Sequence, residues 1–341
     1  GILLSTFPSR GKAYPSAHLD YAFEGRFDIF AHHVVRARDE RDTRTRYLGI
    51  VVHNPSRRPV TLNFREAASY LSQDAPWYGR GDVEYNLAST QFSGPGSRLM
   101  NEILRDRRQT HWPTSLTIPP RTSHVLMSAP LPVRRLAVAT DGTLAPGSEL
   151  LPELPSRLEG RRSNGRSTLM RLVSDGPVHI ASLAMYAPTT ATGERSPTQA
   201  EWLQVLAKGE LATPRDLGPT RPGGQDEPFI YGRVAGVSRG SRWETSLPDR
   251  RSERLAIPDI GQQISYAIST VEQNTFGTGQ IQSAPMLRRY PDTAYRAHGN
   301  YGIEYALTLP LHNPTEQPKT VALSVQTPLQ NETLRNALAF L

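Results

Sequence analysis

Two stretches of the sequence combine aromatic rings with carboxylate, amide and guanidinium groups. One contains Asp74, Trp77, Tyr78 and Asp82, and the other contains Tyr290, Asp292, Tyr295, Arg296, His298 and Asn300. Aromatic faces flanked by such groups stack on sugar rings and bond to their hydroxyls, and Tyr, Trp and Arg also anchor protein interfaces. Alternatively, both loops simply pack on the ends of a β-sandwich. The sequence therefore indicates two candidate binding loops, for a protein partner or for a glycan.

The sequence offers less for catalysis or metal binding. Asp292 and His298 are the one pair that we would test as the acid and base of a glycan-active enzyme. His32 and His33 are adjacent on a predicted strand, so their side chains point to opposite faces and cannot bind one metal together. The chain contains no cysteine, which excludes disulfides, thiolate nucleophiles and zinc sites built on sulfur. We therefore expect no catalytic residue, no metal and no cofactor.

The charge of the chain is spread rather than concentrated. The net charge of +7 arises from 39 basic and 32 acidic residues. Between Arg36 and Arg46 the arginines are interleaved with acids, which is typical of a solvated face. A phosphate-binding stripe has fewer acids, so we do not expect nucleic acid as a partner. Nor does any run approach the roughly 20 apolar residues of a membrane helix, so we expect no transmembrane segment.

The elements that must position the loops are strands, and one strand pattern occurs twice. Residues 50–64, with His53-Asn54-Pro55 at the centre, are echoed by residues 309–323, with His312-Asn313-Pro314. In each copy, apolar residues alternate with polar ones on both sides of the Asn-Pro pair. Proline has no amide to donate and breaks the strand. The pattern predicts a hairpin used in two related β domains.

Further signals predict the turns and the helices. Asp175-Gly176 is the strongest local turn signal and predicts a hairpin between residues 168–173 and 178–186. A helix is predicted over residues 197–208, with Ser196 as its N-cap and Gly209 as its end. Ser97 is predicted to cap a shorter helix, whose apolar stripe includes Leu104.

These elements predict a mainly β protein of two β-sandwich-like domains with one or two short helices. The first domain covers residues 1–213, with an insertion at 141–164, and the second covers 229–341. Residues 214–228 carry four prolines and little that is apolar, so we place the linker there. The second copy of the repeat comes late in the chain. We therefore expect the second domain to be incomplete at its C-terminus and a longer native chain to exist.

Several long segments carry a family resemblance. The strand Phe229-Ile230-Tyr231-Gly232-Arg233-Val234-Ala235-Gly236-Val237, together with residues 68–76, 165–172, 275–280 and 290–302, resembles a cyanobacterial family known only as a domain of unknown function. The resemblance covers essentially the whole chain. It implies an exported protein of the cell envelope with further sequence at both ends, and it brings no catalytic residues.

Taken together, these observations predict a noncatalytic component of the cell envelope or surface that acts through protein contacts. Its partner would be an envelope protein or other copies of the same chain. One alternative is a carbohydrate-binding module that recognises peptidoglycan or surface polysaccharide, and another is the glycan-active enzyme mentioned above. The expected location is the periplasm, the outer membrane surface or the exterior of the cell.

Overall fold

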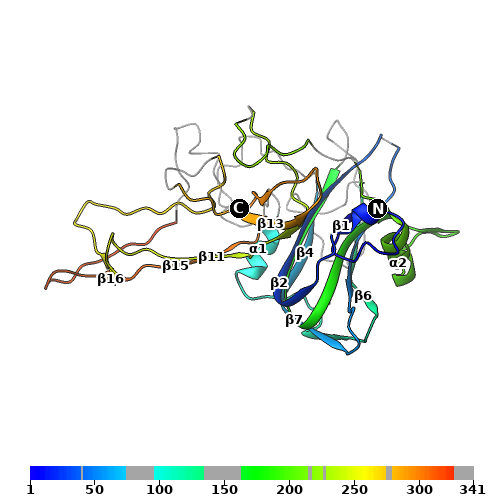
Figure 1. Ribbon diagram of the computed structural model, residues 1–341, viewed down its shortest axis with the longest axis horizontal. Coiled ribbons are helices and arrows are strands. Elements are labelled where there is room, and N and C mark those ends of the chain that lie inside the picture. The colour runs from blue at the N-terminus through cyan, green and yellow to red at the C-terminus, as the bar shows by residue number, and fades with distance from the viewer. Residues whose placement is uncertain are drawn as a thin grey trace.

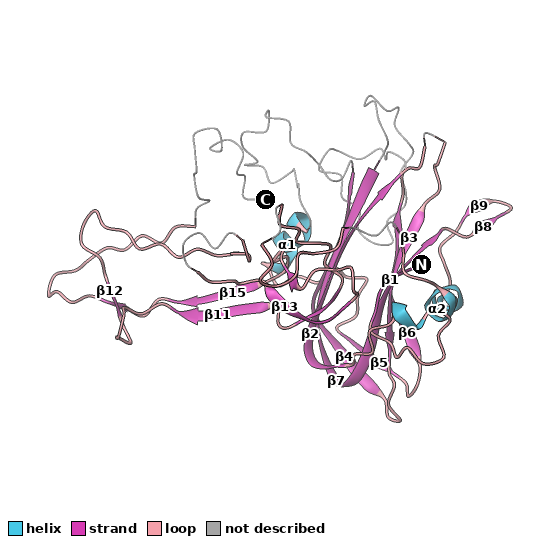
Figure 2. Ribbon diagram, turned by 45° about the horizontal axis from the view of Figure 1, so that its top comes forward, coloured by secondary structure: helices cyan, strands magenta, loops and turns pink. Residues whose placement is uncertain are grey.

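Strands make up most of the regular structure in the computed structural model (Figures 1 and 2), which describes residues 1–39, 41–73, 96–133, 163–213, 217–225, 228–273 and 279–325. The chain is mainly β, as its alternating pattern predicts. The strands of the first half are β1 (Ile2–Ser5), β2 (Phe23–Arg36), β3 (Arg46–His53), β4 (Val60–Gln73), β5 (Ser115–Ile118), β6 (Ser123–Leu131), β7 (Ser163–Tyr186), β8 (Thr189–Thr190) and β9 (Gly193–Glu194). Its helices are α1 (Ser97–Ile103), α2 (Gln199–Lys208) and a 3₁₀ turn at Pro15–Ala17.

Strand β7 organises the first half because it belongs to two layers at once. Its first part pairs with β4 up to Ser174 and with β2 up to Val178, and β5 extends that layer beyond β4. Its second part, from His179 onward, pairs with β1 and β3, and β6 extends this layer beyond β3. All of these pairings are antiparallel. The result is a sandwich-like body whose two layers share one strand (Figure 1).

The predicted hairpin at Asp175-Gly176 is wrong, because β7 runs through these residues without reversing. Gly176 does not adopt the left-handed backbone that such a turn requires. Instead, a Cβ atom on Gly176 would lie 2.8 Å from Cγ2 of Val60, so the glycine allows β4 to approach closely. The Asp175 carboxylate accepts a hydrogen bond from the amide of Thr61 at 2.7 Å. The Asp-Gly pair therefore marks the place where β7 passes from one layer to the other.

Alternate residues of the strands separate the central core from the outer faces. Ile50 and Val52 of β3 point inward, where Met170 and other residues of β7 join the main core. Val51, which lies between them, faces outward and packs against α2. On the other layer, Leu169 packs outward against α1. Each helix thus covers the outer face of one layer.

Both predicted helices are present; α2 begins two residues later than predicted, and α1 begins one residue earlier. Helix α2 is capped by Thr198 rather than Ser196, because the Thr198 hydroxyl accepts from the amide of Glu201 and the Glu201 carboxylate accepts from the amide of Thr198. It ends at Gly209, as predicted. In α1, Ser97 is the first helical residue and Gly96 occupies the capping position. Leu104 is 85% exposed, so it does not belong to the apolar stripe. Neither described α-helix is long and apolar enough to cross a membrane.

The two Asn-Pro turns are built alike. The side-chain amide of Asn54 donates to the carbonyl of Arg58 at 2.7 Å, and its oxygen accepts from the amide of Ser56 at 2.9 Å. In the second copy, Asn313 donates to the carbonyl of Gln317 at 2.7 Å and accepts from the amide of Thr315 at 3.0 Å. The first turn is not a hairpin, since β3 and β4 both pair with β7 in different layers. It is an arch that connects the layers.

The strands of the second half are shorter. They are β10 (Gly236–Ser238), β11 (Arg242–Ser246), β12 (Leu255–Ala256), β13 (Ala284–Arg289), β14 (Arg296–Ala297), β15 (Glu304–Thr308) and β16 (Leu311–His312). Strands β10, β13 and β14 form a small antiparallel sheet, whereas β11 pairs in parallel with β15 and β12 in parallel with β16. The two parallel pairs lie in a long projection that extends away from the body (Figure 1). We call residues 242–268 and 304–325 the arm.

Candidate functional site

The first predicted binding loop, with Asp74, Trp77, Tyr78 and Asp82, lies outside the described residues. The second loop lies where the second half meets the first. Tyr290 is fully buried, and its hydroxyl accepts from the amide of Ser5 at 3.0 Å and donates to the carbonyl of Ala17 at 2.9 Å. Just beyond the loop, Tyr301 stacks on Phe30 of β2, with ring centroids 5.5 Å apart. These two tyrosines therefore attach the second half to the first.

The other residues of this loop make contacts within the second half. The guanidinium of Arg289 lies 3.7 Å from the ring centroid of Tyr295. Arg296 donates to the carbonyl of Ser283 at 3.2 Å. Asp292 is partly buried, and the side-chain amide of Asn300, which is largely buried, lies 3.4 Å from the hydroxyl of Ser269. The loop is thus well connected to its own surroundings.

His298 is held by an aromatic ring and a carboxylate. Its ring meets that of Tyr231 edge-on at 4.6 Å, and its Nε2 lies 3.9 Å from a carboxylate oxygen of Glu272. Burial, together with the charge of Arg296, lowers the pKa of His298 to about 4. The ring is therefore neutral near neutral pH, and the acid that it approaches is Glu272. In the described parts of the chain, no three metal-ligating residues gather in one place.

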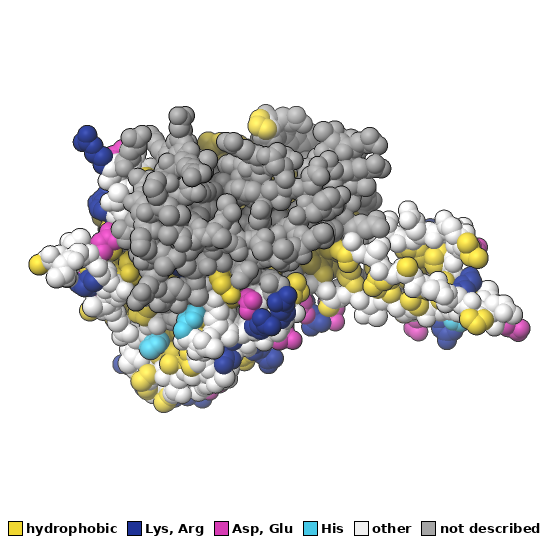
Figure 3. All heavy atoms as spheres, turned by 180° about the vertical axis from the view of Figure 1, so that it is seen from behind, with side chains coloured by type: hydrophobic (Ala, Val, Ile, Leu, Met, Phe, Trp, Pro, Cys, Tyr) yellow, Lys and Arg dark blue, Asp and Glu magenta, His cyan; other side chains and the backbone are white. Residues whose placement is uncertain are grey.

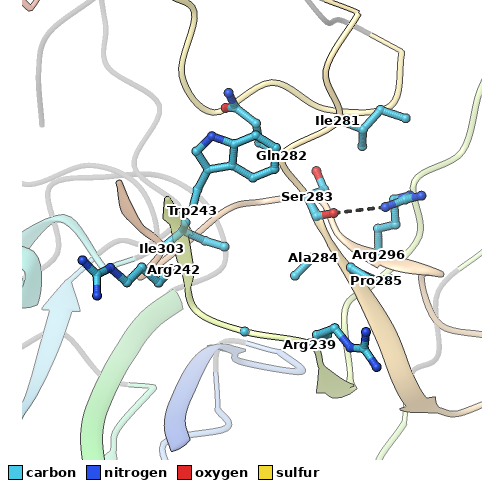
Figure 4. A pocket seen from close by; sticks show the side chains of 11 residues that line it. Arg239, Arg242, Trp243, Ile281, Gln282, Ser283, Ala284, Pro285, Arg296 and Ile303 are labelled. Carbon is cyan, nitrogen blue, oxygen red and sulfur yellow. Dashed lines mark hydrogen bonds between the residues drawn. The ribbon is translucent and has the colours of Figure 1, made fainter. Parts of the chain in front are cut away.

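A small basic pocket lies at the base of the arm, beside this loop (Figure 4). Trp243 and Gln282 lie on one side of the pocket, while the side chain of Arg296 comes from another. Arg239 and Arg242 complete its basic lining. The indole nitrogen of Trp243 donates to the hydroxyl of Tyr266 at 3.0 Å, which fixes the ring. The volume is about 150 Å³, so the pocket has room for one small group rather than a large ligand.

The arm exposes an apolar face along much of its length (Figure 3). The residues of this face are at least 36% exposed, and one of them, Ile260, is fully exposed. They are Ile260, Ile264, Ile268, Leu309, Leu311, Val321, Leu323 and Val325. In residues 321–325, the spacing of two places Val321, Leu323 and Val325 on one side of the chain. Ile260 lies in a turn, where its side chain is left open to solvent. Scattered apolar residues are normal on a protein surface, but a continuous apolar face marks an interaction site.

The first copy of the repeat, in the first half, has the same apolar positions, but there they are buried. The residues of the first arch that match those of the arm are buried, with exposed fractions of 0% to 4% for Ile50, Val52, Leu62 and Phe64. Their counterparts Leu309, Leu311, Val321 and Leu323 are 36% to 80% exposed. The turn geometry is the same in both copies, so the difference lies in the covering strands. In the first copy the two layers of the body cover each other, since Ile50 and Val52 of β3 share one core with Leu62 and Phe64 of β4.

A network of charges fixes the arm to the body. Glu304, the first residue of β15, lies 3.4 Å from Arg26, 3.7 Å from Arg171 and 3.4 Å from Arg242. Arg171 is mostly buried and also approaches Asp28 and Glu66, its neighbours across the strands. The network therefore links β2, β4 and β7 to both strands at the base of the arm.

Sequence reasoning missed the arm and its anchor. The alternating pattern of residues 309–323 correctly marks the residues that can be buried, but it does not say whether a covering layer is present. No local pattern distinguishes Glu304 from any other surface acid, because its partners lie far away in the sequence. The repeat itself was the available signal for the arm.

One of three comparisons with known proteins places the whole chain in a family. The searches of curated proteins and of solved structures gave no match. A family model described as a protein of unknown function (DUF3370) matches residues 1–341. The repeated Asn-Pro turn, the sandwich-like body with its shared strand and the projecting arm are therefore features of a protein that belongs to the DUF3370 family.

Proposed function

We propose that this protein is a noncatalytic component of the cell envelope or surface and that it acts through protein contacts made by the arm. The partner is a second copy of the same chain. The observation that carries the proposal is the exposed apolar face of the arm. Export to the periplasm, the outer membrane surface or the exterior, from a cyanobacterial cell, belongs to the same proposal. The resemblance of residues 229–237 and 290–302 to exported proteins supports it.

The area of the apolar face agrees with a protein interface. Its exposed fractions correspond to roughly 800 Å² of accessible surface, about what each partner contributes to a standard-size interface. At about 25 cal/mol per Å², burial of this area is favourable by on the order of 20 kcal/mol per partner before the costs of association are subtracted. The face is therefore large enough to support a specific dimer.

A second copy is the partner that these features favour. A two-fold interface uses the same surface patch on both subunits, so an apolar face on one arm meets an equal face on the other. The exposed charges of the arm are of both signs, with Arg242, Arg250 and Arg254 near Glu244 and Asp249. An antiparallel pair of arms can therefore bring acids close to bases at the edges of the apolar contact.

Sedimentation velocity with arm variants tests the proposal. Leu323→Asp places a charge on the apolar face, and Leu104→Asp places the same charge at the exposed end of α1 as a control. A Leu buried in the interface contributes about 1.5–3 kcal/mol and occurs twice in a symmetric dimer, so we expect Leu323→Asp to weaken dimerisation roughly 100-fold or more. Leu104→Asp should leave dimerisation unchanged. A wild-type protein that stays monomeric at high micromolar concentration contradicts the proposal, as does a dimer that is indifferent to Leu323→Asp.

A second candidate function is binding to peptidoglycan or surface polysaccharide. It is favoured by the pocket at the base of the arm, where Trp243 lies near Arg239, Arg242 and Arg296. An aromatic ring beside guanidinium groups suits an acidic sugar, because the ring stacks and the cations bind the acid. Retention on purified cell wall that survives salt and is lost in Trp243→Ala supports this function. Absence of retention by the wild-type protein excludes it.

A further inference from the structure

A second cavity, of about 340 Å³, lies between the chain that follows β1 and helix α2. Helix α2 is on the side of the body away from the arm (Figure 1). Its apolar side is formed by Phe7, Leu203 and Leu206. Leu203 and Leu206 come from α2, and Phe7 follows β1 by two residues. A cavity of this size is at the lower end of the range for small-molecule sites.

The polar side of the cavity is a row of neighbours across three strands. His179 of β7 pairs with His53 of β3, and His53 pairs with Ser123 of β6. All three line the cavity. The Phe7 ring contacts both imidazoles, with centroids 5.6 Å from that of His53 and 5.8 Å from that of His179. The row is thus built by the register of the sheet and not by a mobile loop.

Hydrogen bonds show which ring nitrogens of the two histidines are already used within the protein. Nδ1 of His179 lies 2.8 Å from the carbonyl of Thr6 and 2.9 Å from that of Tyr21. Both carbonyls accept, so Nδ1 carries the proton and Nε2 is the other ring nitrogen. Nδ1 of His53 lies 3.0 Å from Oγ of Ser123. An imidazole and a hydroxyl therefore stand side by side, and either can donate a hydrogen bond to a ligand.

The cavity is also positively charged. Arg10 and Lys12 contribute to its lining, and neither forms an ion pair within the described parts of the chain. The ammonium of Lys12 lies 5.4 Å from the centroid of the Phe7 ring. Burial lowers the pKa of Lys12, as it does when an ammonium loses water without gaining a counter-ion. Among the described residues that line the cavity, there is no Asp or Glu to balance these cations.

We propose that this cavity binds a small organic anion with an apolar body, of the chemical class of a medium-chain carboxylate. The anionic group is bound by Lys12 and Arg10 and by the His53–Ser123 pair. The apolar body lies against Phe7, Leu203 and Leu206. A cation is disfavoured because the lining is basic, and an inorganic anion leaves the apolar side unused. The site is separate from the arm and does not depend on the proposed dimer.

Isothermal titration calorimetry with octanoate at pH 7 tests this assignment. We expect saturable binding of octanoate, and binding at least about tenfold weaker for 1-octanol, which lacks the charge, and for inorganic phosphate, which lacks the apolar body. Lys12→Gln should weaken octanoate binding about tenfold, since one direct charge partner is lost. Lys208→Gln removes the same charge from an exposed position on α2 and should leave the affinity unchanged.

Arg10→Gln provides a second variant in case Lys12→Gln alters the fold, which circular dichroism reveals. Saturable octanoate binding that is weakened by either folded variant but not by Lys208→Gln supports the assignment. Three outcomes overturn it: no octanoate binding by the wild-type protein, equal affinity for octanol or for phosphate, and equal affinity of the cavity variants and the Lys208→Gln control.

Discussion

One of the contacts that attach the second half to the first is the buried hydroxyl of Tyr290, and a single-atom change tests its contribution. Tyr290→Phe keeps the buried ring and removes the atom that bonds to Ser5 and Ala17. The amide of Ser5 and the carbonyl of Ala17 then lose a partner in a site from which water is excluded. Each unsatisfied buried group costs about 1–3 kcal/mol, so for the two groups we expect a loss of about 2–6 kcal/mol in the free energy of unfolding.

Equilibrium unfolding in urea measures this change, followed by tryptophan fluorescence. Tyr301→Phe is the matched control, because Tyr301 is half exposed and its stacking on Phe30 does not use the hydroxyl. The control should change the free energy of unfolding by less than about 0.5 kcal/mol, as is usual for surface substitutions. An effect of Tyr290→Phe as small as that of Tyr301→Phe would show that the buried hydroxyl does not help to hold the two halves together.

Three other predictions concern the turns, the packing of α2 and the response to acid. Asn54→Ala should lower the free energy of unfolding by about 2–4 kcal/mol, because the buried side-chain amide also donates to the carbonyl of Ile118. Asn313→Ala, in the more exposed copy, should lower it by about 1 kcal/mol or less. Urea unfolding of both variants checks this difference. Gly49→Ala should lower stability by about 1–3 kcal/mol, because the new methyl group would lie 2.8 Å from the buried ring of Trp202; the melting temperature and the tryptophan emission should both shift. Burial lowers the pKa of His33 from its usual 6.5 to about 4. As the pH decreases from about 6.5 to 4, the unfolded chain therefore takes up a proton before the folded protein does, and the free energy of unfolding should fall. Thermal melts across this range should show a smaller decrease in melting temperature for His33→Gln than for the wild-type protein.

Much of the local structure could be predicted because it depends on neighbours in the sequence. The Asn-Pro turns depend on an asparagine that bonds to residues two and four positions further along, so the same residues gave the same turn twice. Helix α2 is likewise set by its own cap and by Gly209. Alternation also marked Ile50 and Val52 correctly as inward-facing. For these features, all of the residues that determine the local structure lie within a few positions of one another in the sequence.

Features that depend on distant partners could not be predicted in this way. Asp175-Gly176 carries the signal of a tight turn, but in the structure both residues contact β4. Asp175 accepts from the amide of Thr61, and Gly176 allows Val60 to approach closely. In the same way, Tyr290 lies among polar residues in the sequence, which is typical of a binding residue. In the structure its hydroxyl bonds to Ser5 and Ala17, so its role is structural. The sequence thus located a cluster of important side chains at residues 290–300, while the distant contacts determine their roles.

The arrangement of strand β7 has a consequence for how the chain is synthesised. Strands β1, β2, β3 and β4 all precede β7, yet each needs it as a hydrogen-bonding neighbour. Until residues 163–186 leave the ribosome, these strands have edges that no later strand has yet covered. Contacts between residues far apart in sequence form slowly, and uncovered edges invite aggregation. During translation, the first 160 or so residues should therefore depend on chaperones or dilution more than those that follow β7.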